Sequence, residues 1–145
     1  MQVEIRDAPF DPWKEIAIHQ ASVFEQTGRF GATSVFVGTM RDFNEGDKVS
    51  SMTLEHYPGM TERHLESICA QAAERWDVLG VLLIHRVGAV RPGDAIVLVA
   101  VWSAHRAAAY EANRFIMEDL KSVAPFWKRE VLNGESRWVE SNTPG

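Results

Sequence analysis

The order in which helical and extended patterns follow one another is the feature of this sequence that most constrains its fold. Segments rich in β-branched residues are interspersed irregularly with segments of helical periodicity, so the chain does not repeat strand, helix, strand. A clean β-α-β repeat is typical of a parallel sheet, whereas a mixed order favours an α+β fold with largely antiparallel pairing. We therefore predict an α+β protein with three main helices and a mostly antiparallel mixed sheet.

Three segments carry helix signals. Asp11-Pro12 is typical of an N-cap followed by proline in the first turn. Pro58-Gly59 opens a second helix that runs to about Trp76, and Ser103 is the expected N-cap of a third helix that Pro125 ends. Apolar residues recur at helical spacing in each segment, which predicts the inward faces. These faces are Trp13, Ile16, Ala17, Ala21 and Phe24; Leu65, Ile68, Cys69, Ala72 and Trp76; and Ala109, Ala112, Ile116, Leu120 and Val123.

The remaining apolar segments predict strands, separated by polar or glycine-containing breaks. The expected strands cover residues 32–39, 49–57, 81–87, 95–102, 126–132 and 137–140. An exposed loop is expected over 42–47, and turns over 91–94 and at Asn133-Gly134. The chain has no internal repeat or Pro/Gly/Ser-rich linker, so we expect residues 1–145 to form one domain.

Composition excludes several classes of function. Fifteen basic and twenty acidic side chains give a net charge of −5, which disfavours a general nucleic-acid binder. No apolar run approaches the roughly 20 residues that cross a bilayer, and the first residues lack the pattern of a secretion signal. The single cysteine, Cys69, cannot form an internal disulfide, which fits a reducing compartment. We expect a cytoplasmic protein with no membrane or nucleic-acid partner.

The C-terminal third of the sequence places lysines among aromatic residues. Lys121 lies near the end of the third helix, and Lys128 follows Phe126-Trp127 after the proline break. Apolar surroundings remove hydration from a lysine and lower its pKa, which makes it a usable acid or base. From spacing alone the more common interpretation is an ordinary solvated lysine at a helix C-terminus, where the helix dipole favours it.

Other polar residues could bind an anion. His105 and Arg106 follow the expected cap, where free backbone N–H groups and the positive end of the helix dipole favour a phosphate. A capped helix with two exposed polar side chains is an equally good interpretation. Arg41 ends a strand and enters a polar loop, a common place for a ligand contact, although a surface arginine is the more frequent case.

The remaining candidates point away from metal and thiol chemistry. No two histidines have the spacing with an acidic residue that zinc hydrolases use, so we expect no metal, and no motif indicates a cofactor. His19 and His64 are expected to face solvent, whereas His56 and His85 lie in strands as packing or hydrogen-bonding residues. Cys69, on an apolar helical stripe, is expected to be a buried and inert thiol.

Several short strings, taken in order, resemble the MoaE family, the large (catalytic) subunits of molybdopterin synthase. Each string is weak alone, but the ordered set spans about residues 31–140 and is specific. The strings are Gly38-Thr39-Met40-Arg41, Leu54-Glu55-His56-Tyr57-Pro58-Gly59-Met60, Ile84-His85-Arg86-Val87-Gly88, Pro92-Gly93-Asp94, Ser103-Ala104-His105-Arg106, Leu120-Lys121, Ala124-Pro125-Phe126-Trp127-Lys128-Arg129-Glu130 and Arg137-Trp138-Val139. Met40 stands where relatives often have valine.

The resemblance implies both a fold and an activity. The fold is an α/β-hammerhead domain that forms a homodimer, and each copy binds a small ubiquitin-like sulfur-carrier subunit to make a heterotetramer. The carrier's C-terminal glycine holds a thiocarboxylate, which enters a pocket and delivers sulfur to cyclic pyranopterin monophosphate. Two deliveries form the dithiolene of molybdopterin.

The resemblance also implies which residues act. Lys121 and Lys128 take the family's catalytic positions. They are also among the substrate-contact positions, with Thr39, Met40, Arg41, His105, Arg106, Arg129 and Glu130. Because sulfur transfer generates carboxylate and oxyanion character, lysines are suitable groups to stabilise charge and move protons.

Two other functions remain open at this stage. A non-catalytic module that docks a ubiquitin-like partner needs the same surface but not the lysines. A plain phosphate-binding protein explains Arg41, His105 and Arg106 and gives the lysines no role.

The spacing of two candidate residues bears on how many copies of the chain form the site. Sixteen positions of helix at about 1.5 Å each place His105 and Lys121 roughly 24 Å apart. We therefore predict that a site containing both is shared between two copies of the chain.

Overall fold

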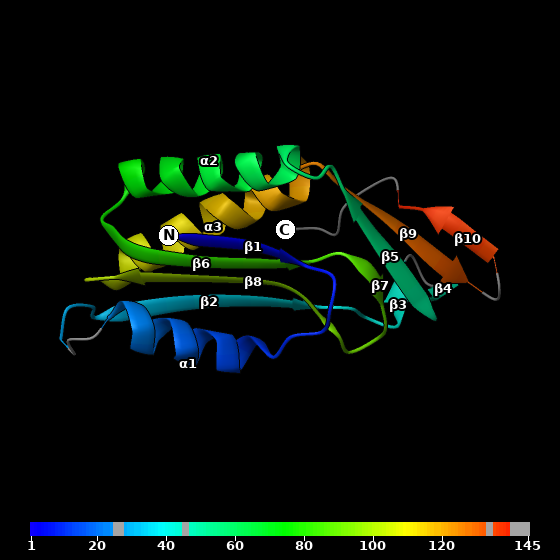
Figure 1. Cartoon of the computed structure of the whole chain (residues 1–145), viewed down its shortest axis with the longest axis horizontal. Helices are drawn as coiled ribbons and strands as arrows, with labels where there is room; N and C mark the ends of the chain where they lie inside the picture. Colours follow the sequence, from blue (N-terminus) through cyan, green and yellow to red (C-terminus); the bar gives the residue numbers. More distant parts are fainter. Residues whose placement is uncertain (25–27, 45–46, 133–134, 140–145) are drawn as a thin grey trace.

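The computed structural model describes residues 1–24, 28–44, 47–132 and 135–139 and contains two four-stranded sheets, one of them covered by helices on both faces (Figure 1). The helices are α1 (Pro12–Val23), α2 (Met60–Arg75) and α3 (Arg106–Ser122). The first sheet has the order β1 (Gln2–Arg6), β6 (Val78–Arg86), β8 (Ala95–Ser103), β2 (Ala32–Thr39). The second has the order β10 (Glu135–Trp138), β9 (Phe126–Leu132), β5 (Ser51–His56), β7 (Gly88–Val90).

The two sheets differ in their pairing. In the first sheet β1 runs parallel to β6 while the other neighbours are antiparallel, and the second sheet is antiparallel throughout. The prediction of an α+β fold with three helices and mostly antiparallel strands is therefore confirmed. The strands form two four-stranded sheets and a short two-stranded one rather than a single sheet, and β1 and β7 were not predicted.

Helices cover both faces of the first sheet, which explains the apolar runs in its central strands. In β6, Leu82 and Ile84 face a cluster on the α1 side, whereas Val81 and Leu83 face the cluster formed with α2 and α3. Successive side chains of a strand point to opposite faces, and a strand covered on both faces is apolar at nearly every position. The larger part of the core therefore lies between this sheet and the α2–α3 layer (Figure 1).

The predicted caps are partly correct. The Asp11 carboxylate accepts hydrogen bonds from the backbone N–H groups of Trp13 and Lys14 at 3.0 and 3.4 Å, as expected of an N-cap. The prediction that Ser103 caps α3 is wrong. Ser103 is the last residue of β8 and its hydroxyl donates to the carbonyl of Asp77 at 2.7 Å, so α3 begins two residues later, with His105 as the N-cap.

The predicted inward faces also need correction. Trp13 and Val123 are each 63% exposed, because Trp13 lies in the first turn of α1 and Val123 follows the last residue of α3. Ala17 and Ala21 of α1 are exposed as well, because α1 packs on the sheet through another face, which contains His19. The central positions of α2 and α3 are buried as predicted. The turn at residues 91–94 is confirmed, with the Asp94 N–H bonded to the Arg91 carbonyl and Gly93 at φ +91°.

The polar segment 42–47 was expected to be a loop, but the structure contains a short hairpin there. β3 (Phe43–Asn44) pairs with β4 (Asp47–Lys48). The predicted turn at Asn133-Gly134 and the end of the predicted strand at Glu140 lie outside the described residues. Within the described part of the chain, no helix combines the length and apolar character that a membrane span requires.

Candidate active site

Two lysines from different elements meet where α3 passes into β9. Lys121 lies in the last turn of α3, and Lys128 is the third residue of β9. Pro125 separates these elements because it has no backbone N–H and disfavours helical geometry at the preceding residue. The chain therefore turns sharply after Ala124, which brings the strand back beside the end of the helix.

Hydrogen bonds from α2 hold this turn in place. The hydroxyl of Thr61, which is fully buried, donates to the Pro125 carbonyl at 3.1 Å and accepts from the Tyr57 N–H at 3.0 Å. One turn later on the same helix, Nε2 of His64 lies 2.7 Å from Oδ1 of Asp119 on α3. The start of α2 thus fixes the segment that positions both lysines.

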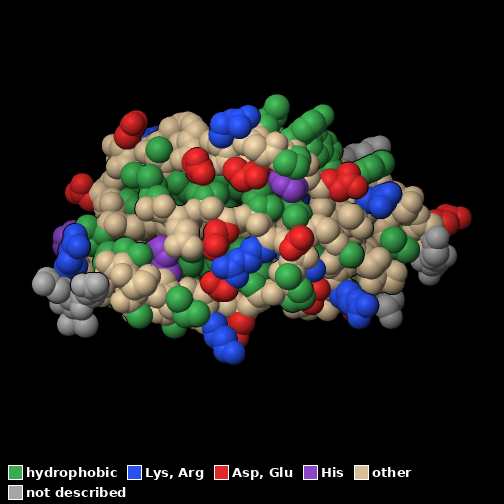
Figure 2. Space-filling model, viewed as in Figure 1, with side chains coloured by type: hydrophobic (Ala, Val, Ile, Leu, Met, Phe, Trp, Pro, Cys, Tyr) green, Lys and Arg blue, Asp and Glu red, His purple; other side chains and the backbone are tan. Residues whose placement is uncertain are grey.

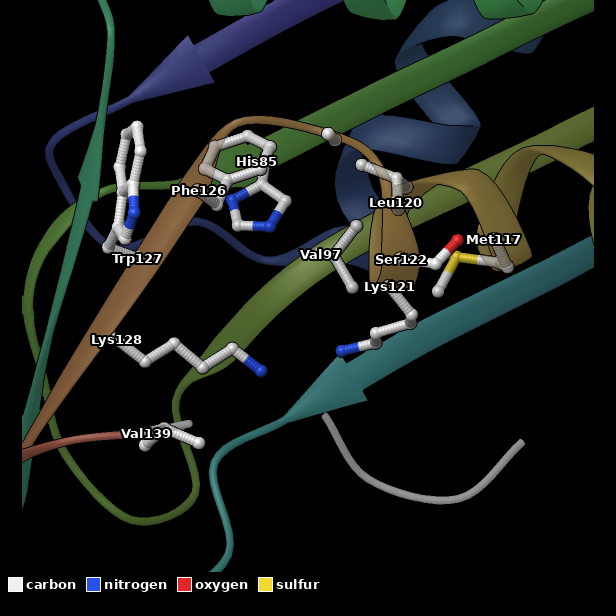
Figure 3. Close-up of a pocket in the computed structure, with 11 residues that line it drawn as sticks. His85, Val97, Met117, Leu120, Lys121, Ser122, Phe126, Trp127, Lys128 and Val139 are labelled. Atoms are coloured by element: carbon white, nitrogen blue, oxygen red, sulfur yellow. The ribbon is translucent and has the colours of Figure 1, made fainter. Parts of the chain in front are cut away.

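The two lysine side chains point into one pocket of about 230 Å³ (Figure 3). Seven of its eleven lining residues are apolar, although polar atoms make up most of its exposed wall. The lining residues are His85, Val97, Met117, Leu120, Lys121, Ser122, Ala124, Phe126, Trp127, Lys128 and Val139. Two potential cations buried in one pocket predict an anionic ligand, because burial weakens their hydration and strengthens their attraction to negative charge.

The surroundings lower the pKa of both lysines. Burial lowers the pKa of Lys121, and a hydrogen bond to Lys128 partly opposes that effect. Burial lowers the pKa of Lys128 to about 8, with the nearby charge of Lys121 and the hydrogen bond to it acting in the same direction, while Glu130 opposes them. Both shifts make this pair release a proton at a lower pH than an ordinary lysine does.

Arg129 and Glu130 continue β9 beyond the pocket. Glu130 is buried and accepts a hydrogen bond from Nε of Arg137 at 3.2 Å. Arg129 is exposed, with its guanidinium 5.7 Å from the centre of the Trp138 ring. Alternation along the strand places Lys128 and Glu130 on one face and Arg129 on the other. Only Glu130 therefore shares the face from which Lys128 enters the pocket.

The segment from Thr39 to Arg41 lies at the same end of the first sheet as the lysines. Val97, in the wall of the pocket, pairs in register with Gly38, the residue before Thr39. Arg41 is exposed, whereas the side chain of Met40 is packed in the core. Thr39 also lines a second, more open cleft of about 550 Å³ beside the start of α1.

His105 and Arg106 do not join this site within one chain. They lie at the N-terminal end of α3, and both are exposed. Lys121 lies at the opposite end of the same helix, fifteen residues after Arg106, or about 22 Å at 1.5 Å per residue. One copy of the chain thus brings Lys121 and Lys128 together and leaves the predicted anion-binding pair at the other end of the fold.

Sequence reasoning did not place His85 in the pocket, although it correctly expected a packing or hydrogen-bonding role. Its ring stacks on Phe126, with centroids 3.8 Å apart. The prediction that His19 faces solvent is wrong, because His19 is buried against Trp102. His64 is only partly exposed, because it is hydrogen-bonded to Asp119. Tertiary packing, which helical spacing does not reveal, decides these environments.

The thiol of Cys69 is buried, as predicted, and burial raises its pKa to about 12. A thiol at neutral pH is a poor nucleophile. Among the residues that the structure describes, no three His, Cys, Asp or Glu side chains are grouped as a metal site. On the face shown in Figure 2, acidic and basic side chains are interspersed rather than gathered into a basic area.

Comparison with known proteins bears on the family to which this chain belongs. The family model described as "MoaE protein" matches residues 5–123. The molybdopterin synthase catalytic subunit of Haemophilus influenzae is 52% identical over 97% of this chain and 91% of its own length. The solved molybdopterin biosynthesis MoaE protein of Burkholderia ambifaria is 41% identical, with a TM-score of 0.80 over 99% of this chain and 92% of that chain.

A more distant structure shares the fold. A chain in the solved complex of subunits 1 and 2 of molybdopterin-converting factor from Helicobacter pylori is 24% identical, with a TM-score of 0.77 over 97% of this chain and 92% of that chain. The family match covers most of the sequence, and the Haemophilus relative matches along nearly its whole length. The chain therefore belongs to the MoaE family of molybdopterin synthase catalytic subunits.

Proposed function

We propose that this chain transfers sulfur from the C-terminal thiocarboxylate of a small ubiquitin-like carrier to cyclic pyranopterin monophosphate, with Lys121 and Lys128 as the catalytic residues. One observation supports this assignment most strongly. Two lysines of lowered pKa, positioned by α3 and β9, enter a single pocket. Burying two potential cations together is unfavourable for folding, so their presence there indicates a chemical role.

The lysines suit the bond changes of this reaction. In each round the carrier's sulfur forms a carbon–sulfur bond at a pterin carbon while a carbon–oxygen bond at that carbon breaks and the oxygen leaves. Water then attacks the acyl carbon, the acyl–sulfur bond breaks, and the carrier is released as a carboxylate with the sulfur left on the pterin. Negative charge develops on the acyl oxygen during this attack, and the Lys121 ammonium can stabilise it. Lys128, with a pKa of about 8, can accept and return a proton near neutral pH. Two rounds complete the dithiolene.

The anion of the pterin substrate needs its own contacts. We assign them to Arg41, which is exposed at the Thr39 end of β2, and to His105 and Arg106 at the start of α3. A helix N-terminus and guanidinium groups both suit a cyclic phosphate. Thr39, Met40, Arg129 and Glu130 stay proposed contacts through the family resemblance. The side chain of Met40 is packed in the core, and its backbone N–H and carbonyl are bonded to Asp94 and Gly93.

A two-fold dimer brings the separated anion-binding residues to the lysines. β2 is an edge strand of the first sheet, and near its middle Val35 and Phe36 are 38% and 40% exposed. An edge strand with exposed apolar side chains is suited to pairing with another chain. We infer that the two copies meet along β2, with the two strands antiparallel about the symmetry axis.

The register of β2 supports this arrangement. Ala32, at the start of β2, pairs with Ser103, which precedes the beginning of α3. Antiparallel pairing of two β2 strands sets the Thr39 end of one copy beside the Ala32 end of the other. His105 and Arg106 of the second copy then lie next to the lysine pocket of the first. Two equivalent shared sites result.

Reconstitution tests the proposed function. The purified chain is mixed with thiocarboxylated carrier and cyclic pyranopterin monophosphate, and formation of the dithiolene product is measured. Carrier with an ordinary C-terminal carboxylate serves as the matched control, because it can dock but has no sulfur to give. Carrier binding without product would instead support the non-catalytic docking module.

We also propose that residues 1–145 act as one domain in the cytoplasm.

A further inference from the structure

His85 is a polar group in the pocket to which the proposed chemistry gives no role. It lies near the end of β6, and only 6% of its surface is exposed. One face of its imidazole stacks on Phe126 at an interplanar angle of 15°. Figure 3 shows the ring on the wall of the space into which the Lys121 and Lys128 amines also point. The ring is therefore held in the wall of the pocket that the two lysines enter.

A backbone contact fixes the tautomer of this histidine. Nδ1 of His85 lies 2.8 Å from the carbonyl oxygen of Arg86. A carbonyl oxygen only accepts hydrogen bonds, so Nδ1 carries the proton and Nε2 presents a lone pair. Burial, together with the nearby Lys121, Lys128 and His56, lowers the pKa of His85 to about 3, although the Arg86 carbonyl opposes this shift. The ring is neutral near pH 7, and Nε2 is an acceptor.

The other polar side chains on the pocket wall have different roles. Lys121 and Lys128 are suited to the terminal thiocarboxylate, because that group is anionic. The hydroxyl of Ser122 donates to the carbonyl of Glu118 at 2.6 Å. A peptide tail, however, also brings backbone N–H groups, and burying one without an acceptor is unfavourable. Nε2 of His85 is the pocket group that meets this need.

We propose that Nε2 of His85 accepts a hydrogen bond from the backbone N–H of the carrier's terminal glycine. The inference rests on the proposed function, because it takes the carrier's tail as the occupant of this pocket. The terminal thiocarboxylate or carboxylate then faces the lysines while the amide beside it faces the imidazole. His85 is thus a specificity determinant that selects a peptide tail over an anion without an N–H group.

Exchanging one atom in the tail tests this hydrogen bond. Two carriers with carboxylate ends are prepared, one native and one in which glycolic acid replaces the terminal glycine, so that an ester oxygen stands in place of the N–H group. Binding to the full chain is measured by calorimetry. We expect the ester carrier to bind the wild-type chain on the order of tenfold more weakly, the effect of one buried hydrogen bond.

Variants of the chain complete a double-mutant cycle. His85→Phe retains a ring against Phe126 but has no acceptor, so it should bind both carriers equally and weakly. His85→Gln can place an amide oxygen near the position of Nε2 and should recover part of the preference for the native tail. The cycle cancels effects of the ester that do not involve His85. His19→Phe, a change at a buried histidine of the α1 layer, is the matched control and should keep the wild-type preference.

The outcomes separate the inference from the proposed function. Equal binding of the two carriers by the wild-type chain overturns the role of His85 while leaving carrier docking intact. A preference for the native tail that persists undiminished in His85→Phe also overturns it. Failure of the native carrier to bind the wild-type chain contradicts the proposed function itself. If His85→Phe does not fold, the comparison of the two carriers on the wild-type chain still decides the matter.

Discussion

Lys121 and Lys128 enter the same pocket, although one lies in the last turn of α3 and the other on β9. Burial lowers the pKa of both lysines, and the charge of Lys121 lowers that of Lys128 further. Because two ammonium groups so placed repel each other, loss of a proton from one favours the charged form of the other. A pair with one ammonium group and one neutral amine provides a charge stabiliser and a proton acceptor.

Removing either amine should abolish most of the activity. Lys121→Ala takes away the ammonium group that stabilises the oxyanion, and Lys128→Ala takes away the proton acceptor. We expect dithiolene formation to fall at least a hundredfold in each variant, measured as single-turnover rates with thiocarboxylated carrier. Lys14→Ala, which changes an exposed lysine on α1, is the control and should be unaffected. Near-wild-type rates in both pocket variants would refute the assignment.

The rate should increase with pH through the pKa of Lys128. Below about pH 8 this lysine is mostly protonated and cannot accept a proton, so the rate should rise tenfold per pH unit and level off above that value. Glu130 raises the pKa of Lys128, so Glu130→Gln should move the rising limb to lower pH. A pH–rate profile of single turnovers checks both statements. If the rising part of the profile does not move in Glu130→Gln, the titration that causes it belongs to a group other than Lys128.

The buried lysine should also limit stability. The pKa of Lys128 falls from 10.5 in the unfolded chain to about 8 in the folded one, so the unfolded state binds more protons between these values. The penalty is fully present below pH 8 and disappears as pH rises to about 10.5. Lys128→Met should therefore have a higher free energy of unfolding at pH 7, by up to roughly 3 kcal/mol, and should unfold at a higher temperature.

Thermal unfolding as a function of pH checks this prediction. The advantage of Lys128→Met over the wild-type chain should shrink steadily between pH 8 and pH 10.5, because both chains then carry no charge at this position. Lys14→Met, at an exposed position, should show no comparable gain at any pH. A Lys128→Met variant that is less stable than wild type at pH 7 would show that the lysine contributes packing or bonding that outweighs its desolvation.

Local patterns predicted the elements whose signals lie within a short stretch of chain. Residues 32–39 form β2 as predicted, because β-branched side chains favour a pleated, half-buried surface. β1 was not predicted, although Gln2–Arg6 alternates polar and apolar residues as a half-buried strand does. The segment is short, and its partner β6 lies more than seventy residues along the chain. Ser103 has the chemistry of a cap, but its hydroxyl is bonded to Asp77, a tertiary contact that spacing does not show.

The site could be predicted only in part. The family resemblance named Lys121 and Lys128, and the structure places both in one pocket. The resemblance gave no reason to place His85 in this pocket. The position of His85 depends on how the end of β6 packs against Phe126, which follows the turn at Pro125. The resemblance also grouped His105 with Lys121, although α3 holds them apart. Position in the sequence thus identifies candidate residues, whereas tertiary packing decides which of them meet.

The lone cysteine should be dispensable for sulfur transfer. Cys69 is fully buried on α2, and burial raises its pKa to about 12, so almost no thiolate exists at neutral pH. We expect Cys69→Ala to retain most of the single-turnover rate, whereas Cys69→Ser should retain activity but unfold at a lower temperature because a hydroxyl is buried. Complete loss of activity in a Cys69→Ala chain with native circular dichroism would mean that the thiol carries sulfur.

The shared site predicts that two inactive variants restore each other. Arg106→Ala removes an anion contact at the start of α3, and Lys121→Ala removes an amine at its end. In a mixed dimer, one site contains both defects and the other contains neither. Mixing the two variants under conditions where subunits exchange should therefore recover activity, up to about one quarter of the wild-type rate if exchange is random and each intact site works independently.

The control for this experiment is a pair of variants with defects on the same side of the shared site. Lys121→Ala and Lys128→Ala affect the same pocket of one chain, so each site of their mixed dimer carries one defect and no activity should return. Exchange is verified by mass spectrometry of differently tagged chains. If Arg106→Ala and Lys121→Ala fail to restore activity despite exchange, each site belongs to one chain. Arg106 must then act at a distance of about 22 Å from Lys121, too far for direct contact with the same small substrate.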